Sequence, residues 1–394
     1  MTIIRSLKQR KYRLRNYDFK LLFFVMLVSI AGLVVVRSAT DGIDSAGSSF
    51  TIFQKQIMGL VVGVIGMALI SLMDYHKLLK WVPLWYVLNV GVLAYLYFFV
   101  SYNVNGARRW IPIGTFLTIQ PSEISKLVIT LVCTAYVARF RDKINHPLVL
   151  LGLLIVVAPP LFLIIKQPAL SATLVHVFII VVIVYVAGIS YKWVFGVIGA
   201  GLAAVAGLWL LMNQEGQVLF QKIFEPHQVK RLNDFFFGSG TTTDQSYQQD
   251  YSVMAIAGGR LHGKGLNNAS FDSVKNGNFL SEEQSDFIWA VVGEELGFIG
   301  CCVIMALLAL IIFQGIMIAR RAKDLEGRLI AIGITSMFAF QTFVNIGVAT
   351  KVLPNTGMQL PFISAGITSQ ISVFAAIGLL LNVSLQRQQL DNRA

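Results

Sequence analysis

The chain has 394 residues, of which 56% are hydrophobic and only 13% charged, and its mean hydropathy is +0.69. This composition excludes an ordinary water-soluble domain, because a folded core cannot cover so much apolar surface, and it predicts membrane spans. The formal net charge of +12 does not indicate nucleic-acid binding, since the basic residues stand mainly in short loops, where they orient a membrane protein.

Ten apolar runs are long enough to cross about 30 Å of hydrocarbon. The first follows a basic stretch and has no small-residue cleavage pattern behind it, so we expect an uncleaved span rather than a secretory signal. We therefore predict ten membrane-spanning helices, at residues 21–36, 57–73, 81–100, 124–137, 147–165, 169–186, 194–212, 296–318, 329–348 and 364–383.

Basic residues mark alternate connections along the chain. They precede the first span and follow the second, fourth, sixth, eighth and tenth spans. Because cytoplasmic loops carry an excess of Lys and Arg, these connections and both termini are predicted to be cytoplasmic. The expected fold is one all-α integral membrane domain over residues 1–394, with a basic cytoplasmic N-terminus at 1–17 and a cytoplasmic C-terminus at 384–394.

Three segments on the outer side depart from simple connections. Residues 101–122 carry positive charge where it should be scarce, and residues 213–285 form a large extracytoplasmic loop, too long for a simple connector. Residues 352–364 contain two prolines and a glycine, and such broken backbone at membrane depth is tolerated only against protein or water. The following span, at 296–318, is long enough to cross the membrane without the apolar residues at 285–297. We therefore expect these residues to form an interfacial or re-entrant helix, within an all-α fold with re-entrant outer segments.

Asp286 stands at the beginning of that surplus helix. A carboxylate at the mouth of a membrane-level helix can take a proton from a hydroxyl group. Aspartate is also a good N-terminal cap. Position alone leaves both roles open.

Glu123 and Lys126 are three residues apart at the start of the fourth span, so they lie on one helix face and can pair. Charges at membrane depth are costly unless they are paired or functional. A structural ion pair and a substrate site both remain open.

Arg108, Arg109 and Trp110 combine forked cations with an aromatic residue that favours the membrane interface. They fit either a diphosphate site or anchorage at lipid headgroups. Lys351 and Arg260 add positive potential on the same side. His176 is interpreted as a hydrogen-bonded packing residue, because no second His or Cys stands at metal-binding spacing.

Seven segments, in order along the chain, resemble motifs of the SEDS family (shape, elongation, division and sporulation; RodA/FtsW/SpoVE-like). They are NGARRWI (105–111), QPSEISK (120–126), KQP (166–168), VKRL (229–232), GGRLHGKGL (258–266), SDFIWAVVGEELGFIG (285–300) and NIGVATKVLPNTGMQLPFISAG (345–366). After KQP, Ala169 and Ser171 differ from the usual aspartate and glycine of the family. After FIS, Ala365 and Ile367 differ from its usual tyrosine and glycine.

The resemblance implies a ten-span peptidoglycan glycosyltransferase that polymerises lipid II at the outer face of the bacterial cytoplasmic membrane, for cell elongation, division or sporulation. By motif, Asp286 matches the aspartate that activates the acceptor hydroxyl. The substrate-binding positions implied by the motifs are Arg108, Arg109, Trp110, Glu123, Lys126, Lys351 and Ser364.

The implied partners are lipid II, undecaprenyl-diphosphate-linked glycan, membrane lipid and a class B penicillin-binding protein that acts as transpeptidase. No tightly bound cofactor is implied, although acidic groups near a diphosphate are compatible with a divalent cation such as Mg²⁺. Two other functions stay open. A lipid II flippase would use the many spans and broken helices, although the unusual charges gather near one side; a non-catalytic scaffold would only recruit a cell-wall enzyme.

Overall fold

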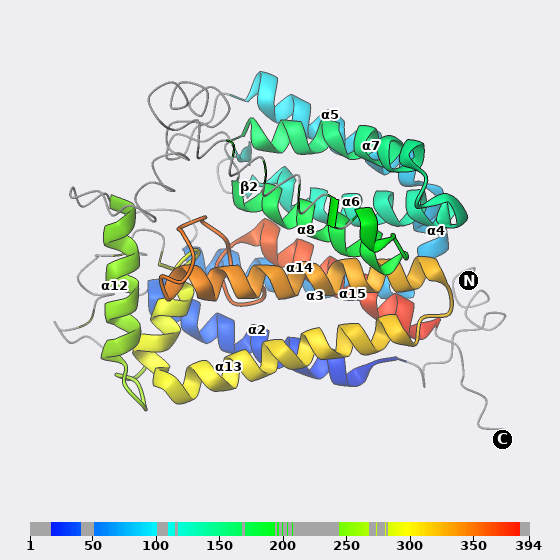
Figure 1. The fold of residues 1–394 in the computed structure, drawn as a ribbon. Coiled ribbons are helices and arrows are strands. Elements are labelled where there is room, and N and C mark those ends of the chain that lie inside the picture. Colours follow the sequence, from blue (N-terminus) through cyan, green and yellow to red (C-terminus); the bar gives the residue numbers. More distant parts are fainter. Residues whose placement is uncertain are drawn as a thin grey trace.

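The computed structural model describes residues 17–40, 51–100, 109–114, 117–167, 170–193, 244–267 and 283–386, with a few isolated positions besides. In this part of the chain nearly all regular structure is helical (Figure 1). The exception is a hairpin of β1 (Ile111–Ile113) and β2 (Leu117–Ile119), in which Ile111 pairs with Ile119. The predicted all-α membrane fold is confirmed.

Among the described residues, eight helices are long and apolar enough to cross a membrane. They are α2 (Phe19–Thr40), α3 (Ile52–Leu72), α5 (Val82–Phe99), α6 (Pro121–Arg139), α7 (Pro147–Ile165), α13 (Ile288–Arg320), α14 (Leu325–Ala349) and α15 (Ile367–Leu385). The apolar helix α8 (Leu170–Val186) is shorter. These helices coincide with the predicted spans, except for 194–212, which falls almost entirely outside the described residues.

Local sequence explains where several helices begin. Thr51 and Gln54 form a reciprocal capping box at the start of α3. Pro121 stands in the first turn of α6, where its missing N–H is no loss. The Asp324 side chain accepts from the Gly327 N–H and so caps α14.

The predicted surplus helix at 285–297 is the first part of α13. Gly297 interrupts α13 with φ 67° and ψ −167°, a left-handed backbone conformation that favours glycine. The break separates a short segment from the long spanning segment that follows. The expectation of a separate helix before the eighth span is therefore confirmed, with Gly297 as the break.

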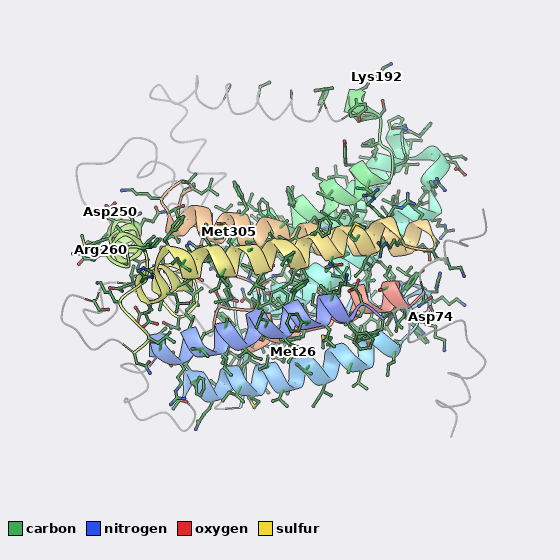
Figure 2. All side chains as sticks on the ribbon, turned by 90° about the horizontal axis from the view of Figure 1, so that it is seen from below. Met26, Asp74, Lys192, Asp250, Arg260 and Met305 are labelled. Atoms are coloured by element: carbon green, nitrogen blue, oxygen red, sulfur yellow. The ribbon has the colours of Figure 1, made fainter. Side chains whose placement is uncertain are left out.

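The bundle has two distinct ends (Figure 1). The end that we call the α12 end carries the β1–β2 hairpin, α12 (Asp244–Gly258) and the 350–366 loop. The opposite end, the α4 end, carries α4 (Tyr75–Lys80), the short η2 helix (Arg141–Lys143) and the turn between α13 and α14. Figure 2 shows Asp250 and Arg260 at the α12 end, and Asp74 and Lys192 at the α4 end.

Of the eight long apolar helices, α14 and α15 are the most enclosed: 72% and 78% of the residues in their apolar stretches are buried. By contrast, only 22% of the residues in the apolar stretches of α5 and α7 are buried. Large apolar side chains such as Phe98 and Phe99 are exposed on α5. Exposed apolar surface of this kind suits contact with lipid, whereas α14 and α15 form the centre of the fold and position the loop that joins them.

Candidate functional site at the α12 end

Asp286 lies in the turn at 283–287, immediately before α13, and its side chain is partly exposed. The N-cap position of α13 is Phe287, so Asp286 stands one residue before the cap. The geometry therefore does not give Asp286 the capping position that its place in the sequence had left open.

Gly357, in the 350–366 loop, lies directly against the Asp286 side chain. A Cβ atom placed on Gly357 would be 3.0 Å from Oδ2 of Asp286. Gly357 also has φ +67°, which a residue with a side chain adopts only with strain. The carboxylate therefore packs against bare backbone, a contact that sequence reasoning missed.

Asn345, on α14, ties the loop to the Asp286 turn. Its fully buried side chain donates through Nδ2 to two backbone carbonyls, 2.9 Å to Asp286 and 2.6 Å to Met358. One carboxamide thus holds the residue that carries the carboxylate and the residue next to Gly357. An Asn inside an apolar span was the available sequence signal for this role.

Ser364 adds a second tie between the same two segments. Its Oγ accepts from the Leu360 N–H at 2.8 Å and donates to the Ser285 carbonyl. Nearby, the Ala365 N–H donates to the Gln284 carbonyl at 2.8 Å. Ser364 was predicted to bind substrate, and the structure engages its hydroxyl with backbone groups beside Asp286.

Glu123 and Lys126 form the predicted pair on α6, with Nζ of Lys126 2.7 Å from Oε2 of Glu123. Both residues are buried, to 8% and 2% exposure. The Ser372 hydroxyl of α15 donates to the Glu123 carbonyl at 2.7 Å. Because a buried charge without a partner is strongly destabilising, this pairing is needed for the fold whatever else the two residues do.

Arg109 and Trp110 lie just before β1 and are partly exposed. Nε of Arg109 donates to the Gln167 carbonyl at 3.4 Å, and the buried Gln167 side chain donates to the Leu93 carbonyl at 3.3 Å. Arg109 is thus located at the connection between α7 and α8. Arg108 lies outside the described residues.

Lys351, predicted to bind substrate, forms an ion pair with Asp250 of α12, and both side chains are substantially exposed. Arg260 is exposed at the same end of the bundle (Figure 2). His176 is fully buried on α8, with Nδ1 2.7 Å from the Ala172 carbonyl and Nε2 3.1 Å from the Ser125 hydroxyl. The prediction that His176 is a hydrogen-bonded packing residue is confirmed.

Two of the sequence motifs meet beside the first part of α13. Nζ of Lys264 is 2.7 Å from Oε1 of Glu294, and the Lys264 N–H donates to the Glu294 carbonyl at 2.8 Å. A Cβ on Gly263 would lie 2.1 Å from the Glu295 carbonyl oxygen, and a Cβ on Gly297 would lie 2.2 Å from the Gly263 nitrogen. The glycines therefore permit a close contact that holds the short helix next to Asp286.

No three His, Cys, Asp or Glu side chains in the described part of the chain form a group that could hold a metal ion. The divalent cation such as Mg²⁺ stays a prediction.

A family profile for FtsW, RodA and SpoVE, described as cell cycle protein, matches residues 19–389. The chain is 31% identical to the probable peptidoglycan glycosyltransferase FtsW of Bacillus subtilis (strain 168), over 97% of this chain and 94% of the relative. It is 33% identical to stage V sporulation protein E of the same organism, over 93% of this chain and 96% of the relative.

Two solved structures share the fold. One belongs to a study of how a peptidoglycan synthase complex coordinates polymerization and crosslinking; it has a TM-score of 0.76 and 25% identity, covering 95% of this chain and 99% of that one. The other is the rod shape determining protein RodA of Thermus thermophilus, with a TM-score of 0.66 and 25% identity, covering 95% and 98%. The chain therefore belongs to the FtsW/RodA/SpoVE family of cell cycle proteins, the SEDS family that its motifs resemble.

Proposed function

We propose that this chain is a peptidoglycan glycosyltransferase that polymerises lipid II at the outer face of the cytoplasmic membrane. The names of the similar FtsW proteins support the reaction class. The observation that carries the proposal is the placement of Asp286, partly exposed in its turn and packed against the backbone of Gly357. Asn345 and Ser364 hold the two segments together around that carboxylate.

In the proposed reaction, the Asp286 carboxylate takes the proton from the acceptor sugar hydroxyl. The acceptor oxygen then forms a bond to the anomeric carbon of the donor sugar, and the bond from that carbon to the diphosphate breaks. Undecaprenyl diphosphate leaves with the bonding electron pair. Arg109, together with Arg108 from the sequence, supplies positive charge that stabilises the charge growing on the leaving diphosphate.

The distribution of buried charge favours an enzyme over a flippase. Every buried Asp, Glu, Lys or Arg in the described part of the chain lies at the α12 end; these are Glu123, Lys126, Glu283, Glu294 and Glu295. Transporters bind near the middle of the bilayer and need a polar path toward both sides. Charge confined to one end suits chemistry at one membrane face.

The orientation follows from the opposite end of the bundle. Short connections at the α4 end are basic and include Lys77, Lys80, Arg141, Lys143, Lys192, Arg321 and Lys323. The excess of Lys and Arg in cytoplasmic loops supports a cytoplasmic α4 end and an outer α12 end. With the ten predicted spans, this orientation would make both termini cytoplasmic.

A transpeptidase of the class B penicillin-binding proteins is the proposed partner. Its support is the similar structure from the complex that couples polymerization with crosslinking. Such a partner would crosslink the strands that this chain makes.

The test compares wild-type protein with Asp286→Asn, each incubated with lipid II and the cognate transpeptidase, with the glycan products separated on a gel. Loss of a general base lowers rates by about 10²- to 10⁴-fold, so Asp286→Asn is expected to make no visible polymer. The matched control is Asp142→Asn, which removes an exposed carboxylate at the α4 end and should polymerise at the wild-type rate.

Equal melting temperatures for the three proteins would show that the comparison concerns chemistry rather than folding. Polymer from Asp286→Asn at the wild-type rate would remove Asp286 as the base. No polymer from the wild type, where a competent relative succeeds, would contradict the enzymatic function and favour the flippase or the scaffold.

A further inference from the structure

Ser171, in the first turn of α8, makes a hydrogen bond to the 350–366 loop. Its Oγ donates to the Gly357 carbonyl over 3.3 Å, and the residue is only 9% exposed. The two residues are 186 positions apart in sequence. This bond therefore ties α8 to the residue whose backbone lies against Asp286.

The bond from Ser171 complements the two other contacts that fix this part of the loop. Within the loop, the Gly357 N–H donates to Oδ1 of Asn355 at 3.1 Å, which holds the turn in its local shape. From α14, Asn345 holds the carbonyl of Met358. Gly357 is therefore held within its own turn and, through Ser171, from α8, while Asn345 of α14 holds the adjacent Met358.

The start of α8 also lies close to the cationic part of the site. Ser171 follows Gln167 by four residues, and the Gln167 carbonyl accepts the hydrogen bond from Arg109. The short stretch that contains Gln167 and Ser171 thus contacts Arg109 through one residue and the Gly357 backbone through the other. A substitution of Ser171 therefore alters the support of the Gly357 turn beside Asp286 without removing a charged group.

We propose that Ser171 is a positioning residue that fixes the Gly357 turn against Asp286 and so sets the space in which the acceptor hydroxyl meets the carboxylate. This inference rests on the proposed glycosyltransferase function. Ser171 touches neither reacting group; it acts through the backbone of Gly357.

The first measurement is hydrogen–deuterium exchange of the full-length protein in detergent, read on the peptide that contains residues 355–358. A neutral hydrogen bond contributes about 0.5–1.5 kcal/mol, so Ser171→Ala should raise exchange in this peptide by about three- to tenfold. Ser171→Thr keeps the hydroxyl and should exchange like the wild type. The matched control is Ser336→Ala, which removes another buried serine hydroxyl, one that bonds to Gly333 within its own helix.

The second measurement is the rate of glycan polymerisation from lipid II by the same proteins with the transpeptidase. Ser171→Ala should lose about three- to tenfold in rate. Ser171→Thr should recover it, and Ser336→Ala should match the wild type at equal melting temperature. Rescue by threonine distinguishes a hydroxyl that positions the turn from a merely well-packed side chain.

Unchanged exchange at residues 355–358 in Ser171→Ala overturns the inference, whatever the polymer assay gives. Faster exchange with an unchanged polymerisation rate also overturns it, because the turn would then be loosened without consequence for the reaction. A wild-type protein that makes no polymer contradicts the proposed function instead, and the exchange result still decides whether Ser171 holds the turn.

Discussion

The Asp286 turn at the α12 end and the α4 turn at the opposite end are tied to their neighbours by different groups. At the α12 end, neutral groups tie the Asp286 turn to α14 and to the 350–366 loop: the Asn345 carboxamide, the Ser364 hydroxyl and backbone groups. At the α4 end, the His76 ring lies between two carboxylates. Its Nδ1 is 2.9 Å from Oδ1 of Asp74, and its Nε2 is 3.0 Å from Oδ2 of Asp324.

The cluster at the α4 end joins three parts of the fold. The Tyr75 hydroxyl donates to Oδ2 of Asp324 at 2.8 Å, which connects the beginning of α4 with the beginning of α14. The Tyr75 N–H donates to Oδ1 of Asn382 at 3.1 Å, and the Gln386 side chain donates to Asp74 at 3.3 Å, which connects both to the end of α15. Glu326 adds a carboxylate oxygen 3.9 Å from Nε2 of His76.

This difference concerns how each set of contacts depends on pH. Hydrogen bonds between neutral groups do not depend on protonation, so the bonds that Asn345 and Ser364 make to the Asp286 turn do not vary with pH. Charge pairs at the α4 end vary with pH, and they lie at the end of the bundle opposite to the carboxylate.

Asn345→Asp should have the largest effect, because it puts a titratable group in place of the neutral carboxamide that ties the Asp286 turn to the loop. The new carboxylate would face the carbonyls of Asp286 and Met358 and lose both donated bonds. We expect a loss of about 3 kcal/mol in the free energy of unfolding and about 100-fold in polymerisation rate. Thermal melting and the lipid II assay measure the two effects.

Asn145→Asp is the matched control, because Asn145 is exposed at the α4 end and uses its oxygen as an acceptor from the Ser190 N–H. It should resemble the wild type in both measurements. Retention of full activity by Asn345→Asp would show that the carboxamide does not support the site.

Gly357→Ala tests the contact with Asp286 at smaller scale. The left-handed conformation costs about 1–2 kcal/mol for a residue with a Cβ, and the methyl group would press on Oδ2 of Asp286. We expect about a tenfold fall in polymerisation rate. Gly114→Ala separates the two effects, because Gly114 has φ +64° and open space around its Cβ position; it should lose stability without losing activity.

Much of this fold could be predicted from the sequence, because lipid demands long apolar helices and charge bias orders their connections. The bounds of α7 are those predicted, and the pair of Glu123 and Lys126 followed from helical spacing. The contact of Gly357 with Asp286 could not be predicted, since it depends on how a loop packs against a distant turn. Lys351 was predicted to face substrate, but its partner Asp250 lies in a segment expected only as a loop.

His76→Gln should have the smallest effect. Burial of the ring lowers the pKa of His76, but the bonds and charges of Asp74 and Asp324 outweigh it, so its pKa lies above the ordinary value. For Asp74, burial raises the pKa, but the hydrogen bonds from His76 and Gln386 outweigh burial, so the pKa of Asp74 lies below its ordinary value.

The sign of the effect follows from these two directions. The His76 contribution is complete below the ordinary histidine pKa of about 6.5 and is lost as the pH rises through the raised pKa. The Asp74 contribution is lost as the pH falls through the lowered pKa. Because the cluster is partly exposed, the free energy of unfolding of the wild-type protein should exceed that of His76→Gln by about 1 kcal/mol or less in mildly acidic solution. The difference should be smaller at alkaline pH. Melting curves across pH measure this margin, and a margin that grows with rising pH would contradict the assignment.

The central claim is that one carboxylate at the α12 end performs the chemistry, while the titratable cluster at the α4 end only holds the helices. The most direct measurement is the rate of lipid II polymerisation against pH for wild-type protein and His76→Gln, side by side. The account predicts that both rates fall on the acid side along the same curve, as the Asp286 carboxylate is protonated. A rate without an acid limb, or an acid limb that moves in His76→Gln, would contradict it.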